Sequence, residues 1–156
     1  MNWPPAKTIM ISTPNPWATI PIAASGQLAR LRVDAESRST LFWFRDDREK
    51  PGLLIEIAPT VSPSRLKQLK INIRDIFIDV IPLSADGGRA LLLRLEEQQH
   101  QDIFLKLGYD LIERVNSATS GEDTFGVIVT RLKKWQALFS GKGRSVLSLS
   151  EIQWLY

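Results

Sequence analysis

The spacing of apolar residues changes past the middle of the chain, and this change constrains the fold more than any other feature of the sequence. Up to residue 95, segments such as "LARLRVD" alternate apolar and polar residues, which is the period-two pattern of half-buried β-strands. From residue 102 onward, apolar residues recur every three or four positions, as they do in amphipathic helices. The sequence therefore predicts an α+β fold, with a largely antiparallel sheet of about five strands followed by two amphipathic helices and the start of a third.

Five segments carry the strand pattern, and turn residues separate them. The charged turn "DDREKP" joins the second and third segments as a hairpin. Asp86 and Gly87 lie between the fourth and fifth segments, where glycine supplies the positive φ of a tight turn. The fourth segment has a break near Arg74, and "SPSRLKQL" before it is expected to form a short helix. The five segments span residues 28–34, 40–45, 52–58, 70–83 and 89–95.

Two helices of about 16 to 18 residues are predicted in the second half of the chain. Gly108 lies inside the first helix and marks a place of close packing. Ser148 and Glu151 have the spacing of a capping box, so a third helix is expected to start where the chain ends. The apolar faces comprise Ile103, Phe104, Leu107, Leu111 and Val115 in the first helix and Phe125, Ile128, Leu132, Trp135 and Phe139 in the second.

Proline content and periodicity divide the chain into three parts. Residues 1–26 carry five prolines and are expected to form an extended arm, which Trp3 and Trp17 pin to the body. Residues 27–140 form the α+β domain. Residues 141–156 are expected to form a loop and a truncated helix that leads towards a segment outside this sequence.

Composition excludes several classes of function. The chain has no cysteine, which rules out disulfides, thiolate zinc sites and cysteine nucleophiles. Its one histidine, His100, lies in the polar run "EEQQHQD" without a nucleophile motif, so we interpret it as part of a solvated loop. No apolar run reaches the roughly 18 residues of a membrane span, and the N-terminus lacks the apolar core of an export signal. A cytoplasmic protein without a membrane segment is expected.

Acidic residues give only weak indications of a metal site. Glu56 interrupts an apolar strand and Asp79 lies in another, and carboxylates of this kind can bind magnesium. The alternating pleat of a strand explains a single outward acid equally well. We therefore interpret these acids as a solvated charged face and assign no catalytic, cofactor-binding or metal-binding residue.

Basic residues gather in and after the second predicted helix. A face of this kind can follow the phosphates of nucleic acid, although many such faces are only solvated. The net charge of +3 neither supplies nor excludes a DNA-binding cluster. The candidate phosphate contacts are Arg131, Lys133, Lys134, Lys142 and Arg144.

The segments "LLLRL", "DIFLKLGYDLIERV", "RLKKWQALF" and "LSLSEIQWLY" follow one another in an order and spacing that resemble the N-terminal part of the PD-(D/E)XK motif protein family. That family is described as bacterial nucleases of restriction and phage-defence systems. The resemblance covers residues 27–156. Its most recognisable positions are Phe104, Asp110, Leu111, Arg131, Leu132 and Trp135.

The resemblance implies a catalytic Glu-x-Lys strand beyond the helix that starts at residues 148–156. Within this sequence, no lysine has an acidic residue two positions before it. Such nucleases hold magnesium with several carboxylates, and a lysine polarises the attacking water or the phosphate. Magnesium is therefore expected only for a full-length nuclease, and this chain has no cofactor of its own.

Two functions from different classes follow from these observations. The chain is expected to be the N-terminal accessory domain of a PD-(D/E)XK-type DNA endonuclease, which docks the core or positions DNA and is inactive alone. The alternative is a stand-alone interaction or assembly module without nuclease activity. In both cases residues 148–156 are expected to pack against a partner chain or against the missing core. An independent hydrolase that uses Asp79 or Glu56 is a third and weaker hypothesis.

Overall fold

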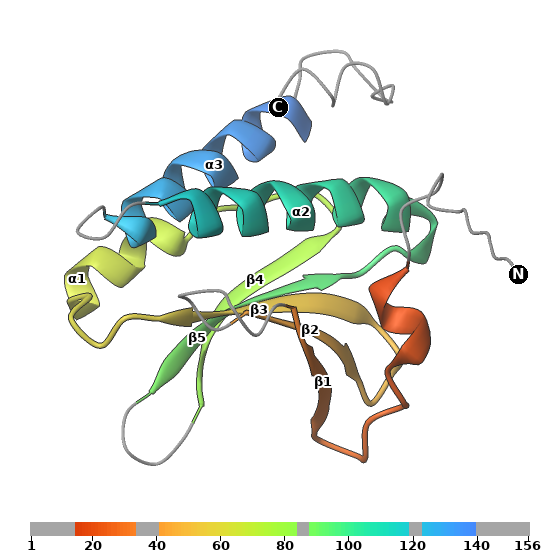
Figure 1. Cartoon of the computed structure of the whole chain (residues 1–156). Helices are drawn as coiled ribbons and strands as arrows, with labels where there is room; N and C mark the ends of the chain where they lie inside the picture. The colour runs from red at the N-terminus through yellow and green to blue at the C-terminus, as the bar shows by residue number, and fades with distance from the viewer. Residues whose placement is uncertain (1–14, 34–40, 84–87, 119–122, 140–156) are drawn as a thin grey trace, which may run out of the picture.

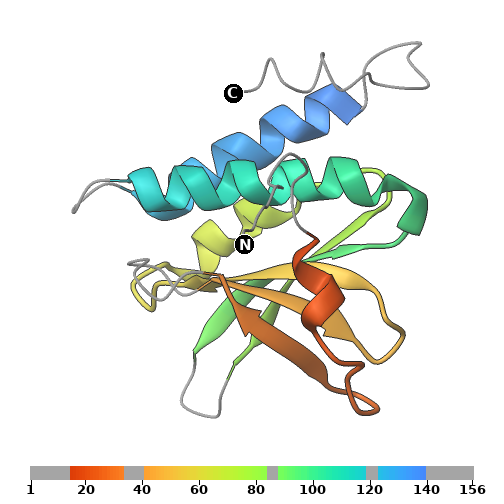
Figure 2. The same ribbon diagram turned by 45° about the vertical axis from the view of Figure 1, so that its right-hand side comes forward.

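A computed structural model of the chain describes residues 15–33, 41–83, 88–118 and 123–139. Figure 1 shows a five-stranded sheet with the two long helices lying side by side over one of its faces, and Figure 2 shows the same two layers from a second direction. The α+β prediction is confirmed: the antiparallel strands come first along the chain and the two long helices follow them.

Every neighbouring pair of strands is antiparallel, and the strand order is β1-β2-β3-β5-β4. The last strand therefore lies between β3 and β4, and β1 and β4 are the edges of the sheet that the described residues form. The predicted break near Arg74 is confirmed, because β4 begins only after a turn that an isolated bridge between Ile73 and Ile76 closes. The strands are β1 (Leu28–Arg32), β2 (Leu41–Asp46), β3 (Pro51–Ile57), β4 (Ile76–Pro82) and β5 (Arg89–Leu95).

The predicted hairpin between β2 and β3 is held by one buried carboxylate. Asp46 is 6% exposed, and its Oδ1 accepts hydrogen bonds from the backbone N–H of Arg48 at 2.9 Å and of Lys50 at 2.8 Å. Glu49 has a positive φ of 65°, a conformation that L-residues rarely adopt. The aspartate therefore satisfies the amides of a turn whose backbone is tightly folded.

The helices lie where the apolar periodicity predicts them. The short helix expected at "SPSRLKQL" is confirmed, and its N-cap is Ser62, whose hydroxyl accepts from the backbone N–H of Arg65 at 3.3 Å. The helical elements are η2 (Pro16–Thr19), α1 (Pro63–Leu66), η3 (Lys67–Leu69), η4 (Gln98–His100), α2 (Gln101–Ser117) and α3 (Thr124–Phe139).

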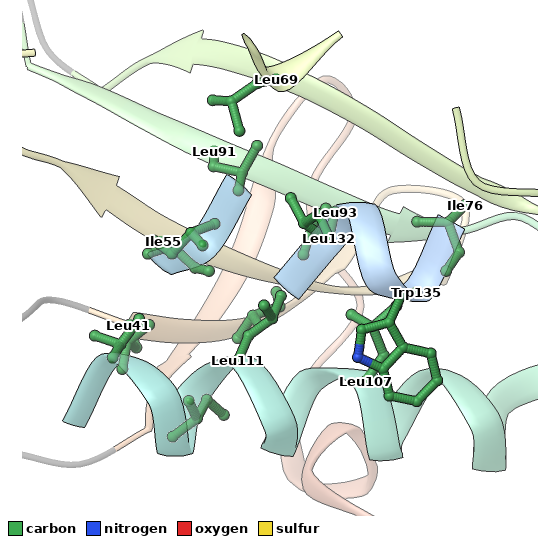
Figure 3. Packing of buried hydrophobic residues seen from close by; sticks show 14 of the residues in the cluster. Leu41, Ile55, Leu69, Ile76, Leu91, Leu93, Leu107, Leu111, Leu132 and Trp135 are labelled. Atoms are coloured by element: carbon green, nitrogen blue, oxygen red, sulfur yellow. The ribbon is translucent and has the colours of Figure 1, made fainter. Parts of the chain in front are cut away.

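The main core lies between the sheet and the two long helices (Figure 3). Alternate residues of the central strands point towards the helices, as the pleat requires. Each large apolar side chain buried here contributes about 1.5 to 3 kcal/mol relative to an exposed one. The fully buried side chains include Leu53, Ile55, Leu91, Leu93, Leu107, Leu111, Leu132 and Trp135.

The opposite face of the sheet carries a smaller apolar cluster. It consists of Phe44, Leu54, Ala90 and Leu92, which are between 0% and 5% exposed. Among the described residues, no helix lies on this face (Figure 1). The two faces explain why the central strands are apolar at almost every position instead of alternating strictly.

Trp17 fixes the described part of the N-terminal arm to the body, as the sequence predicts. Its indole N–H donates to the carbonyl oxygen of Gly52 at 3.0 Å, and the side chain is 3% exposed. Its ring meets the edge of Trp43, with centroids 5.1 Å apart, and stacks on Phe104 at 5.8 Å. Trp3 lies outside the described residues.

Gly108 of α2 lies at a close contact between helix and sheet. A Cβ at this position would lie 3.0 Å from two ring atoms of Trp43. The absence of a side chain therefore lets the helix approach the sheet closely, as the sequence predicts. Across the described ranges, no helix is long and apolar enough to cross a membrane. The Asp86–Gly87 turn and the third helix start lie outside those ranges.

Candidate functional site

A buried carboxylate joins the two long helices. Asp110 of α2 is 0% exposed, and its two oxygens accept hydrogen bonds from Nε and Nη2 of Arg131, both at 2.9 Å. The indole N–H of Trp135 donates to the same carboxylate at 2.9 Å. Arg131 is itself only 7% exposed, so this bidentate ion pair lies away from water.

A second arginine approaches the same carboxylate from within α2. Nε of Arg114 lies 3.6 Å from Asp110 Oδ1, one helical turn further along, and it has no hydrogen-bond partner among the described residues. The Arg114 side chain is 40% exposed, so the rest of it reaches the surface. One buried negative charge therefore faces two guanidinium groups.

This cluster contains polar residues of the family pattern quoted above. Asp110, Arg131 and Trp135 come from recognisable positions on two different helices, and the structure brings all three into direct contact. Their role is to fix the position of α3 on α2, because a bidentate pair with an added indole bond permits only one relative placement of the helices. These three residues of the family pattern thus explain how α3 is held on α2.

Arg131 does not fit the predicted phosphate contact. Its guanidinium is buried and both its Nε and Nη2 are bonded to Asp110, so it does not face a nucleic acid at the surface. The spacing contains the signal for this, since Ile128, Arg131 and Trp135 lie three and four residues apart and so share the apolar face of α3. An arginine on that face requires a buried acid, which Asp110 supplies.

Lys133 and Lys134 lie on the other side of α3 and are exposed. The step of 100° per residue turns them away from Leu132, which is 0% exposed and points into the core. These two residues are the described part of the candidate phosphate-contact surface, which we call the α3 lysine pair. Lys142 and Arg144, the other two predicted contacts, lie outside the described residues.

The acids considered at the sequence level lie apart from one another. Glu56 is the exposed residue of β3, and Asp79 is exposed on β4. Over the described ranges, no three residues among His, Cys, Asp and Glu come together as a metal site. The side chains that the structure describes therefore do not fit a magnesium centre of the nuclease type, which needs several oxygen ligands.

His100 lies at the start of α2 and is less isolated than the sequence suggests. Its Nδ1 is 3.0 Å from Oδ2 of Asp75, and its side chain is 40% exposed. Asp75 has a positive φ of 65° in the turn before β4. Among the described residues, no serine bonds to the ring, and the contact with Asp75 joins the helix start to the turn before β4.

Comparison with known proteins agrees with the pattern found in the sequence. Residues 13–156 match the family described as "Putative PD-(D/E)XK family member, (DUF4420)". No curated protein and no solved structure gives a significant match. Because the match covers nearly the whole chain and includes both helices of the buried cluster, this chain belongs to that PD-(D/E)XK family.

Proposed function

We propose that this chain is the N-terminal accessory domain of a PD-(D/E)XK-type DNA endonuclease of restriction or phage-defence systems. It positions DNA or docks the catalytic core in the cytoplasm and does not cleave DNA alone. The observation that carries the proposal is the family match over residues 13–156, in a sequence in which no lysine follows an acid at the Glu-x-Lys spacing. Magnesium is expected only in a full-length nuclease.

The rigid helical layer supports a positioning role. The ion pair between Asp110 and Arg131 fixes the rotation of α3, and that rotation presents Lys133 and Lys134 to solvent. A pair of adjacent cations on a fixed helix can contact successive phosphates without reading the bases. Binding through this surface is therefore expected to be weak, independent of sequence and strongly dependent on salt.

A salt titration with duplex DNA tests this proposal. The 156-residue chain is titrated against a fluorescein-labelled 20-base-pair duplex, and anisotropy gives the association constant between about 25 and 200 mM salt. The variant K133A/K134A removes two phosphate contacts, so the slope of log K against log salt should fall in magnitude by about 2. Nuclease activity is assayed in parallel with magnesium, and no cleavage is expected.

The matched control is K67A/K70A, which removes two exposed lysines from a different surface while leaving α3 intact. This control should bind DNA like the unmodified chain. A chain that fails to bind DNA at the lowest salt, or a K133A/K134A variant with an unchanged slope, would show that the α3 lysine pair does not position DNA. Magnesium-dependent cleavage by the chain itself would contradict the accessory role.

A further inference from the structure

Some of the backbone N–H and C=O groups of the edge strand β4 point away from the sheet. In an antiparallel pair, residues alternate between those that bond to the neighbouring strand and those that point outward. Backbone hydrogen bonds fix both ends of the ladder between β4 and β5. The N–H of Leu83 donates to the carbonyl oxygen of Gly88 at 2.7 Å, and the N–H of Glu96 donates to the carbonyl oxygen of Asp75 at 2.8 Å. Odd-numbered residues of β4 therefore face β5, and the even-numbered ones face the edge.

Two further hydrogen bonds agree with this alternation. The N–H of Ile76 donates to the carbonyl of Ile73 at 3.1 Å, outside the ladder. The N–H of Val80 donates to Oδ1 of Asp79 at 2.8 Å, which is a partner outside β5. The residue between them, Ile78, accordingly presents both its N–H and its C=O at an edge that no described strand covers, and Val80 presents its C=O there.

A groove of about 510 Å³ runs along this edge. We call it the β4 groove; one wall is the β4 edge at Ile78 and Val80, and the other is the short helical segment that includes Leu66. All three of these apolar side chains are only partly buried, although each packs against the main core. The groove thus combines open backbone groups with incompletely covered apolar surface.

The charge along the groove is mostly positive. Lys67 and Lys70 line its outer wall, are exposed, and form no ion pair with any residue that the structure describes. The acid in the lining, Asp79, is engaged with the backbone of Val80. Two unneutralised ammonium groups beside an open strand edge favour an occupant that carries carboxylates.

We propose that the β4 groove binds an extended acidic segment of a partner protein, which adds to the sheet as a sixth strand next to β4. The main chain of the segment bonds to the N–H and C=O of Ile78 and to the C=O of Val80. Its alternate apolar side chains cover Leu66, Ile78 and Val80, and its acidic side chains meet Lys67 and Lys70. This is recognition by strand addition, in which backbone bonds give affinity and side-chain pockets give selectivity.

The edge itself explains why the interaction is selective. Asp79 occupies the N–H of Val80, and Pro82, the last residue of β4, has no N–H to offer. These features blunt the edge against indiscriminate pairing between copies of the chain. A partner therefore needs complementary charge as well as an extended backbone. Nucleic acid fits this surface less well, because phosphates have no donor for the outward C=O groups and leave the apolar floor uncovered.

A peptide titration tests the proposal. The probe is a fluorescein-labelled eight-residue peptide of alternating valine and glutamate, with a valine and lysine peptide of equal length as its charge control. We expect the acidic peptide to bind the 156-residue chain and the lysine peptide to bind at least tenfold more weakly. The variant K67E/K70E should weaken the acidic peptide at least tenfold. The variant K133E/K134E, which changes the same charge on α3, should leave binding unchanged.

Backbone pairing is tested with two N-methylated versions of the acidic peptide. One is methylated at the odd-numbered residues and the other at the even-numbered residues. Methylation in the register that faces β4 should weaken binding at least tenfold, and methylation in the other register should not. Equal binding of all the peptides, or no effect of K67E/K70E in a variant whose circular dichroism is unchanged, would overturn the proposal. If duplex DNA displaces the acidic peptide from the unmodified chain, and K67E/K70E abolishes this competition, the groove binds nucleic acid instead. These experiments measure peptide binding in the β4 groove and not DNA binding by the α3 lysine pair, so their failure leaves the proposed DNA role standing.

Discussion

Replacing Asp110 by asparagine should destabilise the chain more than any exposed charge change on the same helix. Asparagine keeps the shape of the side chain but removes the charge that Arg131 and Trp135 contact. Breaking a buried pair by removing one partner costs about 3 to 5 kcal/mol, because the remaining charge stays buried without compensation. In a protein of 156 residues, about 1 kcal/mol shifts the melting temperature by roughly 3 °C. The expected decrease is therefore about 10 to 15 °C.

Thermal and urea unfolding followed by circular dichroism measure this effect. The control is Glu113→Ala, an exposed residue on the same helix, which should change the free energy of unfolding by less than about 0.5 kcal/mol. The double variant D110L/R131M replaces the ion pair with apolar side chains and should recover most of the lost stability. A D110N melting temperature within about 3 °C of the unmodified chain, or a double variant less stable than D110N, would show that the buried ion pair does not carry this stability.

Two further predictions concern packing and pH. Gly108→Ala should lower the free energy of unfolding, measured by urea unfolding, by about 1 kcal/mol. The new Cβ would press on the Trp43 ring, and this overpacking outweighs the gain in helix propensity. A variant more stable than the unmodified chain would show that the Trp43 ring moves aside. Burial alone raises the pKa of Glu96, but Arg94 and Lys50 lower it overall. The stability that a lowered pKa gives is present above the unfolded pKa of about 4.3 and is lost as pH falls through the folded pKa. Glu96→Gln should therefore lose less stability than the unmodified chain between about pH 5 and 3. Parallel pH curves for the two proteins would contradict this reasoning.

Local pattern was sufficient to predict most elements. The alternation in the strand segments and the three-and-four spacing in α2 and α3 depend only on which face of each element meets the core. The turn at Asp46 and the break near Arg74 were readable for the same reason, since turn residues act through their own backbone. These predictions needed no knowledge of distant contacts.

The order of the strands required the tertiary structure. The hairpin β4-β5 and the hairpin β2-β3 are local, but the pairing of β3 with β5 joins residues more than thirty positions apart, such as Ile55 and Leu91. Several strand orders satisfy the same periodicity, and only the packing of the whole sheet selects one. The open edge of β4, and with it the groove proposed to bind a partner, follows from that order.

The candidate site divides in the same way. The sequence by itself determined that α3 has an apolar face and a basic face, that the family pattern includes Asp110 and Arg131, and that no Glu-x-Lys element is present in these residues. Only the tertiary structure decided that Arg131 is buried, because the spacing places it on the apolar face but does not show which acid it pairs with. The physical reason is that a charged side chain is buried only where another element supplies its counter-charge, and that element is distant in the sequence.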